Sequence, residues 1–469
     1  MILILAFAFF SRIWRLHIPS NYIFDEVYHA STAKLIANND ERAFEWDSKA
    51  PEENTAIDWL HPPLAKYTQA FFIKTFGETS FAWRLSSTLF AVGLIYLIYL
   101  LAEELFADFK ISLLAAFLAS LDGLLLVQSR IAMNDVHVSF FIILTLLLYL
   151  RNRRIKNPES RIKNLFWVGL TAGLAMASKW SGVFALGIIW LFSAIGQPAF
   201  GWGNYNLLKN NFKNFIKIFL VLAILPIAIY ILSYSQMFLQ GKSLFCFEQK
   251  AIKNICYYGQ IKFRDKIIWN GYWSHFAELH RQIFHYQTHL DATHSYQSRP
   301  WQWFLNMKPV WVWVDYGDGA RADIYAQGNT ILFWSGAIAV AISLALVILN
   351  LFQDLFKIKI KILDQGFGEL SRVVRDDTWG IFLILLSYFL VWLPWQLSPR
   401  IMFFYHYLPA VPLLCILLAY WLTKLNKYFI YFVLFLIILN FVLFYPHWTG
   451  ISMPNEWKDS LYFFFESWK

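Results

Sequence analysis

Apolar stretches of membrane-spanning length recur from one end of this chain to the other, and they constrain its fold more than any other feature. Each is close to the ~20 residues that a helix needs to cross the hydrocarbon core of a bilayer. They predict an all-α polytopic membrane protein, a single membrane domain over 1–469 with about eleven transmembrane helices. We place the spans at about 1–17, 84–105, 111–128, 136–151, 164–180, 182–196, 214–232, 330–352, 379–396, 402–422 and 428–446.

Charge supports this assignment and orients the chain. Only 15% of residues are charged, against about a quarter in soluble proteins. The net charge is +9, but the basic residues gather in loops, which indicates topology and contact with anionic lipid rather than nucleic acid. With a cytoplasmic N-terminus, the inside loops are 152–163, 197–213, 353–378 and 423–427. Two long loops, 18–83 and 233–329, then lie on the extracytoplasmic face of the plasma membrane.

The chain termini and cysteines add little. Residues 1–10 have no basic segment and no cleavage site, so we interpret them as part of the first span rather than as a removed signal. The cysteine spacing does not match a zinc motif. Cys246 and Cys256 share the second long loop, where free thiols are favoured over a disulfide.

Adjacent carboxylates, Asp25 and Glu26, open the first long loop at the predicted membrane boundary. Such a pair is either a solvated loop feature or a catalytic base with a supporting group. Residues 28–37 after it have the pattern of a short helix lying on the membrane. Further along, His61 precedes two prolines that stiffen the loop, and it either donates to an anion or caps a turn.

Several basic residues stand near predicted outer ends of spans, against the positive-inside trend. Each alone would be expected to snorkel toward water. Together they would collect on the same face as Asp25, where a lipid phosphate is a natural partner for guanidinium groups. Asp135 begins a span on that face and either pairs with one of them or caps its helix. The basic residues are Arg12, Arg15, Arg84, Arg130, Lys179 and Arg400.

The second long loop is rich in histidine and aromatic residues. His285 and His289 have the spacing of a metal-binding pair on one helix face, so a zinc site stays open, although the pattern lacks the usual third ligand. A later stretch mixes hydrogen-bonding groups with aromatic rings, which suits a sugar or an interfacial aromatic belt. Its residues are His294, Tyr296, Gln297, Ser298 and Trp301.

These strings, in this order, resemble the protein O-mannosyltransferase family, whose members have the GT-C membrane glycosyltransferase fold. The resemblance covers most of the chain. It is carried by Phe24-Asp25-Glu26, His61-Pro62-Pro63-Leu64-Ala65-Lys66, Arg84-Leu85-Ser86-Ser87, Ser129-Arg130 with Asp135, Ser178-Lys179-Trp180-Ser181-Gly182, His294 with Tyr296-Gln297-Ser298 and Trp301, and Arg400 with Met402-Phe403-Phe404-Tyr405.

The resemblance implies transfer of mannose, with inversion, from a polyprenyl-phosphate carrier to Ser or Thr hydroxyls of secreted or membrane proteins. It implies no nucleotide sugar, and we expect neither a cofactor nor a metal. The second loop is too short for the β-trefoil-type domain of eukaryotic members, so a prokaryotic form is expected. Ser295 stands where the family often has proline, and the His285–His289 stretch also departs from its pattern.

Roles follow from this chemistry. We expect Asp25 to act as the base and Glu26 to orient the acceptor or a neighbouring group. Carrier-phosphate binding is assigned to Arg12, His61, Arg84, Arg130, Asp135, Lys179 and Arg400, and sugar or acceptor binding to the 294–301 group. The alternatives are a related GT-C transferase that moves another sugar to a lipid or glycan, a transporter, and a binding or assembly protein. A transporter would need charges near mid-membrane and inverted repeats.

Overall fold

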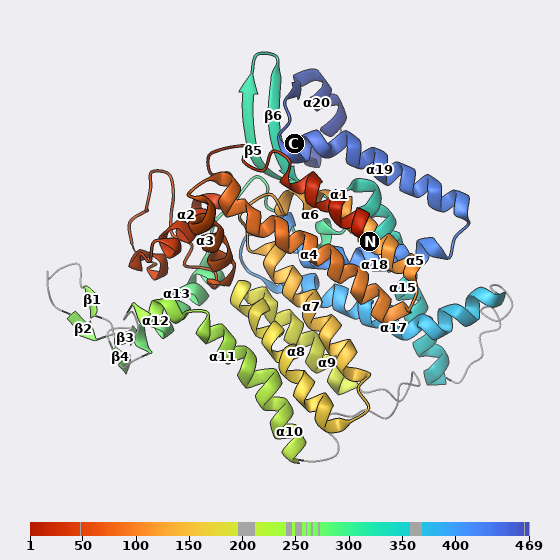
Figure 1. Cartoon of the computed structure of the whole chain (residues 1–469), viewed down its shortest axis with the longest axis horizontal. Helices are drawn as coiled ribbons and strands as arrows, with labels where there is room; N and C mark the ends of the chain where they lie inside the picture. Colours follow the sequence, from red (N-terminus) through yellow and green to blue (C-terminus); the bar gives the residue numbers. More distant parts are fainter. Residues whose placement is uncertain are drawn as a thin grey trace.

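The computed structural model describes residues 1–469 apart from 47, 196–211, 241–245, 249–255, 259, 264–265, 271–272, 357–367, 464 and 469. The predicted inside loop 197–213 falls largely outside the described residues, and so do residues 357–367 of the predicted loop 353–378 and the side chains of Cys246 and Cys256. Figure 1 shows a molecule built mainly of helices.

Every predicted span coincides with a helix. Six helices in the described part of the chain are long and apolar enough to cross a membrane, and four shorter apolar helices accompany them. The structure therefore agrees with a multi-pass membrane protein, and the number of crossings stays a prediction. The α-helices that coincide with the predicted spans are α1 (Ile2–Ile13), α4 (Ser80–Phe106), α5 (Phe109–Ser120), α7 (Asp135–Arg153), α8 (Pro158–Ser178), α9 (Val183–Ile195), α10 (Phe212–Phe219), α11 (Leu225–Leu232), α15 (Thr330–Phe356), α17 (Gly368–Trp392), α18 (Val411–Thr423) and α19 (Lys427–Thr449).

Three predicted spans are interrupted. In the span at 214–232, a π-helical stretch, η3 (Leu220–Ile224), lies between α10 and α11. The span at 111–128 divides at Asp122, whose carboxylate accepts the backbone N–H of Leu125 at 2.7 Å and so begins a new helix, α6 (Gly123–Gln128). The span at 402–422 starts as a 3₁₀ helix, η6 (Phe404–Ala410), because Pro409 cannot supply the N–H that a regular α-helix needs there. The expected tight turn after Ser178 is confirmed as a 3₁₀ turn, η2 (Trp180–Gly182).

The first long loop folds into a compact unit of α2 (Glu26–Ala37), η1 (Glu41–Phe44) and α3 (Leu64–Phe76). The helix predicted at 28–37 is confirmed as α2. Most of its side chains are buried against the rest of the protein, and its place relative to the membrane surface stays a prediction. Ala30 and Ile36 of α2 share a hydrophobic cluster with Leu279 and Ile283, which lie on a helix of the second loop, α13 (Ser274–His289). This cluster holds the two long loops together.

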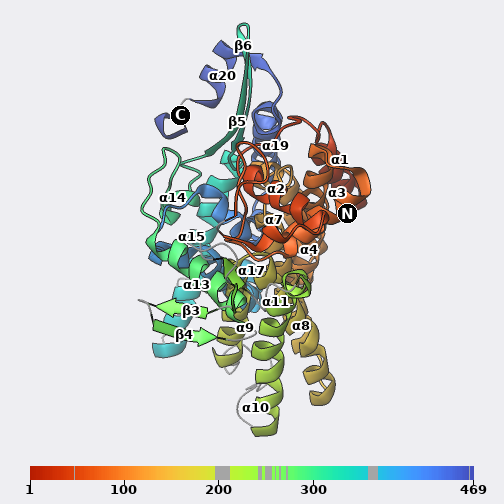
Figure 2. The same ribbon diagram turned by 90° about the vertical axis from the view of Figure 1, so that its left-hand side faces the viewer.

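The second long loop departs from an all-α fold. Its strands β5 (Val310–Gly317) and β6 (Ala320–Ala326) form an antiparallel hairpin, and β7 (Met453–Pro454) adds a third strand. Two smaller hairpins pair β1 (Cys246–Glu248) with β2 (Cys256–Tyr258) and β3 (Gln260–Phe263) with β4 (Lys266–Asn270). The loop also holds the short helices α12 (Ser235–Leu239) and α14 (Pro300–Trp303), and α20 (Asn455–Tyr462) follows β7. Figure 2 shows the β5–β6 hairpin at the opposite end of the molecule from α10.

Candidate active site

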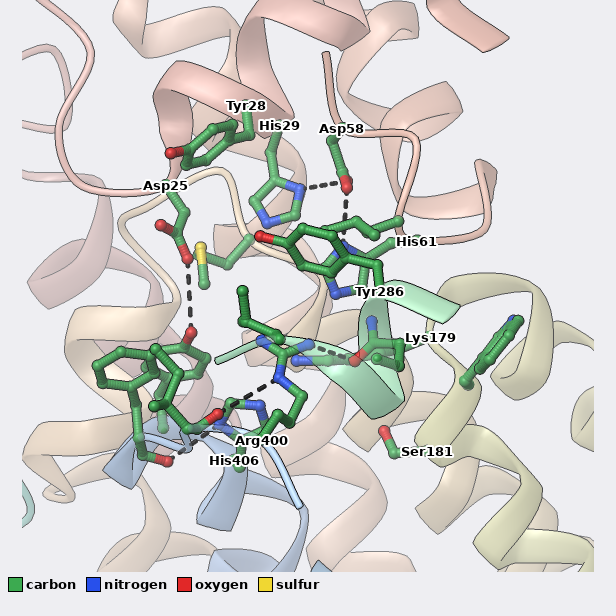
Figure 3. A pocket seen from close by; sticks show the side chains of 18 of the residues that line it. Asp25, Tyr28, His29, Asp58, His61, Lys179, Ser181, Tyr286, Arg400 and His406 are labelled. Carbon is green, nitrogen blue, oxygen red and sulfur yellow. Dashed lines mark hydrogen bonds and ion pairs between the residues drawn. The ribbon is translucent and has the colours of Figure 1, made fainter. Parts of the chain in front are cut away.

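A cavity of about 470 Å³ lies where the two long loops meet the ends of the helices. The N-terminus of α2 and the segment 56–61 form one wall, α13 contributes Tyr286 and Gln287, and the turn after α8 contributes Lys179. The segment 395–406 closes the cavity with Arg400, Tyr405 and His406 (Figure 3). The cavity is therefore assembled from segments that are far apart in the sequence.

Asp25 lies on the wall of this cavity at the N-cap position of α2. It follows Phe24, whose positive φ of 49° turns the chain sharply into the helix. The Tyr405 hydroxyl donates to Oδ2 of Asp25 at 3.5 Å. Burial raises the pKa of the Asp25 carboxyl, and the neighbouring His29 and Lys179 partly offset that rise. A half-buried carboxylate with a raised pKa is better suited to accept a proton than an exposed one.

Glu26 points away from the cavity. Its side chain is fully buried, and its two oxygens pair with Nε and Nη2 of Arg84 at 2.8 and 2.7 Å. The backbone N–H groups of Ile23 and Ala132 also donate to it, at 3.1 and 3.0 Å. The structure therefore does not place Glu26 where it would orient an acceptor. It pairs with a neighbouring group, Arg84, which agrees with the other role expected for it. Successive side chains at a helix start diverge, so only Asp25 of the pair reaches the cavity.

The guanidinium of Arg84 bonds to other groups of the protein. Besides Glu26, its guanidinium donates to the carbonyls of Leu16, Pro19 and Asn21 at 3.1, 2.7 and 3.1 Å. These bonds fasten the segment between α1 and α2 to α4. The expectation that Arg84 binds a carrier phosphate does not agree with this geometry, because its donors are already used inside the fold.

Arg12 and Arg130 also lie away from the cavity. Nη1 of Arg130 donates to the carbonyls of Arg12 and Trp14 at 2.6 and 2.7 Å, which satisfies the C-terminal carbonyls of α1. Arg12 is fully buried, with Nη1 3.5 Å from the carbonyl of Ser120 at the end of α5. Both residues secure α1 against its neighbours, so the structure brings neither to the predicted phosphate site. The nearby Arg15 adopts a positive φ of 53° at the turn that follows α1.

Lys179 and Arg400 are the predicted cations that reach the cavity. Nζ of Lys179 lies 2.8 Å from Oδ1 of Asp135, and both residues are buried. Asp135 thus pairs with a basic residue, in agreement with one of the two sequence interpretations. Arg400 donates through Nη1 to the side chain of Gln287 on α13.

A second cavity, of about 300 Å³, adjoins the first, and Arg400 and Ile401 line both. The segments 292–302 and 399–402 supply its wall, which includes Gln297 and Ser298. The other predicted sugar-binding residues line neither cavity. His294 packs edge-to-face on Phe403, Tyr296 packs near Trp311 and Tyr325, and Trp301 is 51% exposed.

Three residues of the first cavity region had no assigned role at the sequence level: His29, Asp58 and Lys66. Asp58 is buried and accepts from Nδ1 of His29 at 2.7 Å, Nδ1 of His61 at 2.8 Å and Nζ of Lys66 at 2.9 Å. Lys66 follows His61 in a string that carries the family resemblance, but its partner could not be read from that string. His61 itself lines the cavity, as expected for a site residue.

His29, Asp58 and His61 are also the group in the described residues whose ligand atoms lie close enough to hold a metal, within 4.8 Å of one another. Their spacing fits hydrogen bonds better. Ligand atoms around a tetrahedral zinc ion lie roughly 3.4 Å apart, given metal–ligand bonds of about 2.1 Å. The imidazole–carboxylate distances here are 2.7 and 2.8 Å, and the Lys66 ammonium already supplies a positive charge. His285 and His289 stack with ring centroids 4.4 Å apart on the exposed side of α13.

Comparison with known families decides the assignment. Residues 2–239 match the family described as dolichyl-phosphate-mannose-protein mannosyltransferase. Residues 272–468 match the C-terminal four-transmembrane region of protein-O-mannosyltransferase. The chain belongs to the protein O-mannosyltransferase family. It is accordingly a glycosyltransferase, and the resemblance seen in the motifs is confirmed.

Curated relatives and a solved structure agree with this membership. The chain is 24% identical to a polyprenol-phosphate-mannose–protein mannosyltransferase of Corynebacterium glutamicum, over 87% of this chain and 81% of the relative. It is 24% identical to the Mycolicibacterium smegmatis protein of the same name, over 100% and 92%. Its fold is similar to that of the S. cerevisiae Pmt1-Pmt2 complex bound to the sugar donor, with a TM-score of 0.76, 15% identity and coverage of 100% and 92%.

Proposed function

We propose that this glycosyltransferase moves mannose from a polyprenyl-phosphate carrier to Ser or Thr hydroxyls of proteins at the extracytoplasmic face of the plasma membrane. The names of the relatives support the sugar, the carrier and the protein acceptor. The observation that carries the proposal is one cavity lined both by a carboxylate, Asp25, and by two cations, Lys179 and Arg400. Transfer from a sugar phosphate needs those two kinds of group on opposite sides of the reacting carbon.

In the proposed reaction, the acceptor hydroxyl attacks the anomeric carbon as the bond to the carrier phosphate breaks. Asp25 takes the hydroxyl proton as attack proceeds. A single displacement inverts the sugar carbon and needs one base, whereas retention would require a carboxylate nucleophile as well. Glu26 cannot serve as that second group because it is bonded to Arg84. The oxygens of Asp58, the other carboxylate on the cavity wall, are held by Lys66 and two histidines. The geometry thus supports inversion.

The leaving phosphate requires positive charge. Arg400 and Lys179 are fixed at the cavity wall, Arg400 by Gln287 and Lys179 by Asp135. Cations that are already in place stabilise developing charge without reorganising at the moment of reaction. In our proposal, they do the work that a divalent metal does in many other glycosyltransferases, with Arg400 as the main phosphate ligand because its guanidinium can bind two oxygens at once.

The second cavity suits the acceptor polypeptide. The residues that line it belong to loop segments rather than to the candidate membrane-spanning helices. An acceptor polypeptide in the aqueous phase can therefore reach it. Thr293, Gln297, Ser298 and Gln302 offer uncharged hydrogen-bonding groups, which match the alternating donors and acceptors of an extended backbone. Arg400 lies at the junction, where acceptor hydroxyl and carrier phosphate would meet.

The test is transfer by the purified chain in detergent or proteoliposomes. Radiolabelled polyprenyl-phosphate-mannose and a Ser/Thr-containing peptide are supplied, with the matched Ala peptide as control. We expect label on the Ser/Thr peptide alone. Label that moves to lipid or glycan and not to peptide, or transfer only from a carrier bearing another sugar, would contradict the proposal.

A further inference from the structure

Two imidazole rings on the wall of the first cavity turn the same nitrogen toward one carboxylate. Nδ1 of His29 lies 2.7 Å from Oδ2 of Asp58, and Nδ1 of His61 lies 2.8 Å from Oδ1. The ring centroids are 5.3 Å apart, so the rings form neighbouring parts of one surface. Figure 3 shows the dashed bonds that converge on Asp58 from both rings.

Asp58 holds its charge because of Lys66. The ammonium lies 2.9 Å from Oδ2 of Asp58 and 2.7 and 2.9 Å from the carbonyls of Asp58 and His61. Burial alone would raise the pKa of Asp58, but Lys66 and then the two histidines hold it well below its usual range. An ionised carboxylate can only accept hydrogen bonds, so Nδ1 of each ring must carry a proton.

The protonation of Nδ1 decides what the other ring nitrogen can do. Burial lowers the pKa of His61 to about 4, so this ring is neutral at neutral pH. A neutral ring with its proton on Nδ1 has a lone pair on Nε2 and accepts there. An acceptor at the cavity wall suits a hydroxyl group. It does not suit a phosphate oxygen, which is the partner expected for His61 from the sequence.

We propose that His29 and His61 bind neighbouring hydroxyl groups of the transferred sugar through Nε2, and that Asp58 is the positioning residue that sets both tautomers. The proposal rests on the function proposed above. Two adjacent acceptors need two adjacent hydroxyls, which a hexose carries and a Ser or Thr residue does not. The acceptor hydroxyl has its own partner in Asp25. This assigns the carrier's sugar to the side of the cavity formed by α2 and the segment 58–61.

The test compares binding of two ligands to the detergent-solubilised full chain: polyprenyl-phosphate-mannose and polyprenyl phosphate without sugar. His61→Phe keeps a ring of similar size and removes Nε2. We expect it to weaken binding of the mannosyl carrier roughly tenfold, the effect of one lost hydrogen bond, and to leave binding of the bare carrier unchanged. His61→Gln, which returns an acceptor oxygen near the same place, should restore part of the difference. The control is His17→Phe at an exposed histidine in the turn after α1.

Asp58→Asn tests the positioning role, since an amide presents a donor to one of the rings and reverses its tautomer. We expect the same selective loss for the sugar-bearing ligand. If this variant unfolds because Lys66 loses its partner, the two variants His61→Phe and His61→Gln still test whether the sugar is bound at this wall. Equal weakening for both ligands, or an unchanged preference in His61→Phe, would overturn the inference. A wild-type chain that neither prefers nor transfers mannose would instead overturn the proposed function.

Discussion

Replacing Arg84 distinguishes between two roles for this residue, a structural residue and a phosphate ligand. Replacing it with Met removes five hydrogen bonds: two to the carboxylate of Glu26 and three to the carbonyls of Leu16, Pro19 and Asn21. Both side chains of the ion pair are almost completely buried, at 1% and 0% exposure. Breaking such a pair costs about 3–5 kcal/mol, because the remaining charge stays buried without a partner. The three lost carbonyl bonds place the expected cost at the upper end of that range.

The assay is thermal unfolding of the detergent-solubilised chain, paired with donor affinity. Arg84→Met should unfold at a clearly lower temperature, while its folded fraction binds polyprenyl phosphate as the wild type does. The double variant Arg84→Met/Glu26→Gln should recover part of the stability, since it leaves no buried charge unpaired. Arg42→Met, at an exposed pair with Asp40, is the matched control and should change little. Normal unfolding of Arg84→Met combined with weakened phosphate binding would show that Arg84 is a phosphate ligand and not a structural residue.

Further predictions concern the cations of the cavity. Lys179→Met should shift the acid limb of the pH profile of kcat/KM upward: the lysine charge lowers the pKa of Asp25, so without it the base stays protonated to higher pH. An unchanged or lowered limb would contradict this. Arg400→Ala should raise the donor KM about 10- to 100-fold and the peptide KM much less, and a larger effect on peptide would argue against phosphate contact. A chelator should leave activity intact; loss restored by a divalent ion would contradict the assignment of fixed cations.

The helices could be predicted from the sequence because hydrocarbon thickness imposes a length that apolar stretches must match. The interruptions could not. Asp122 separates two helices and caps the second through a single side-chain hydrogen bond. Hydropathy averaged over a window of residues does not reveal such a bond. The β5–β6 hairpin was missed because its alternation of Val310, Val312 and Val314 with Trp311 and Trp313 fits an aromatic membrane belt as readily as a strand.

The site was predicted in part. Asp25, His61, Lys179 and Arg400 were singled out from composition and topology, and the structure brings all of them to one cavity. The sequence did not distinguish Arg84, which has a structural role, from these cavity residues. Its partner Glu26 lies 58 residues away in the chain, and nothing in the local sequence indicates the pair. The same limit applies to Asp58. The role of a loop carboxylate depends on the imidazoles and the ammonium that the fold places around it, and these partners are not apparent from the local sequence.

In the proposed reaction, Asp25 takes the proton of the acceptor hydroxyl. This role is tested by the Asp25→Asn variant in single-turnover transfer of labelled mannose from polyprenyl-phosphate-mannose to a Ser/Thr peptide, with donor binding measured on the same preparation. Asparagine has the same size and cannot accept the proton. We predict a loss of transfer of at least roughly 100-fold with donor binding within about threefold of wild type. Transfer at the wild-type rate would show that Asp25 is not the base.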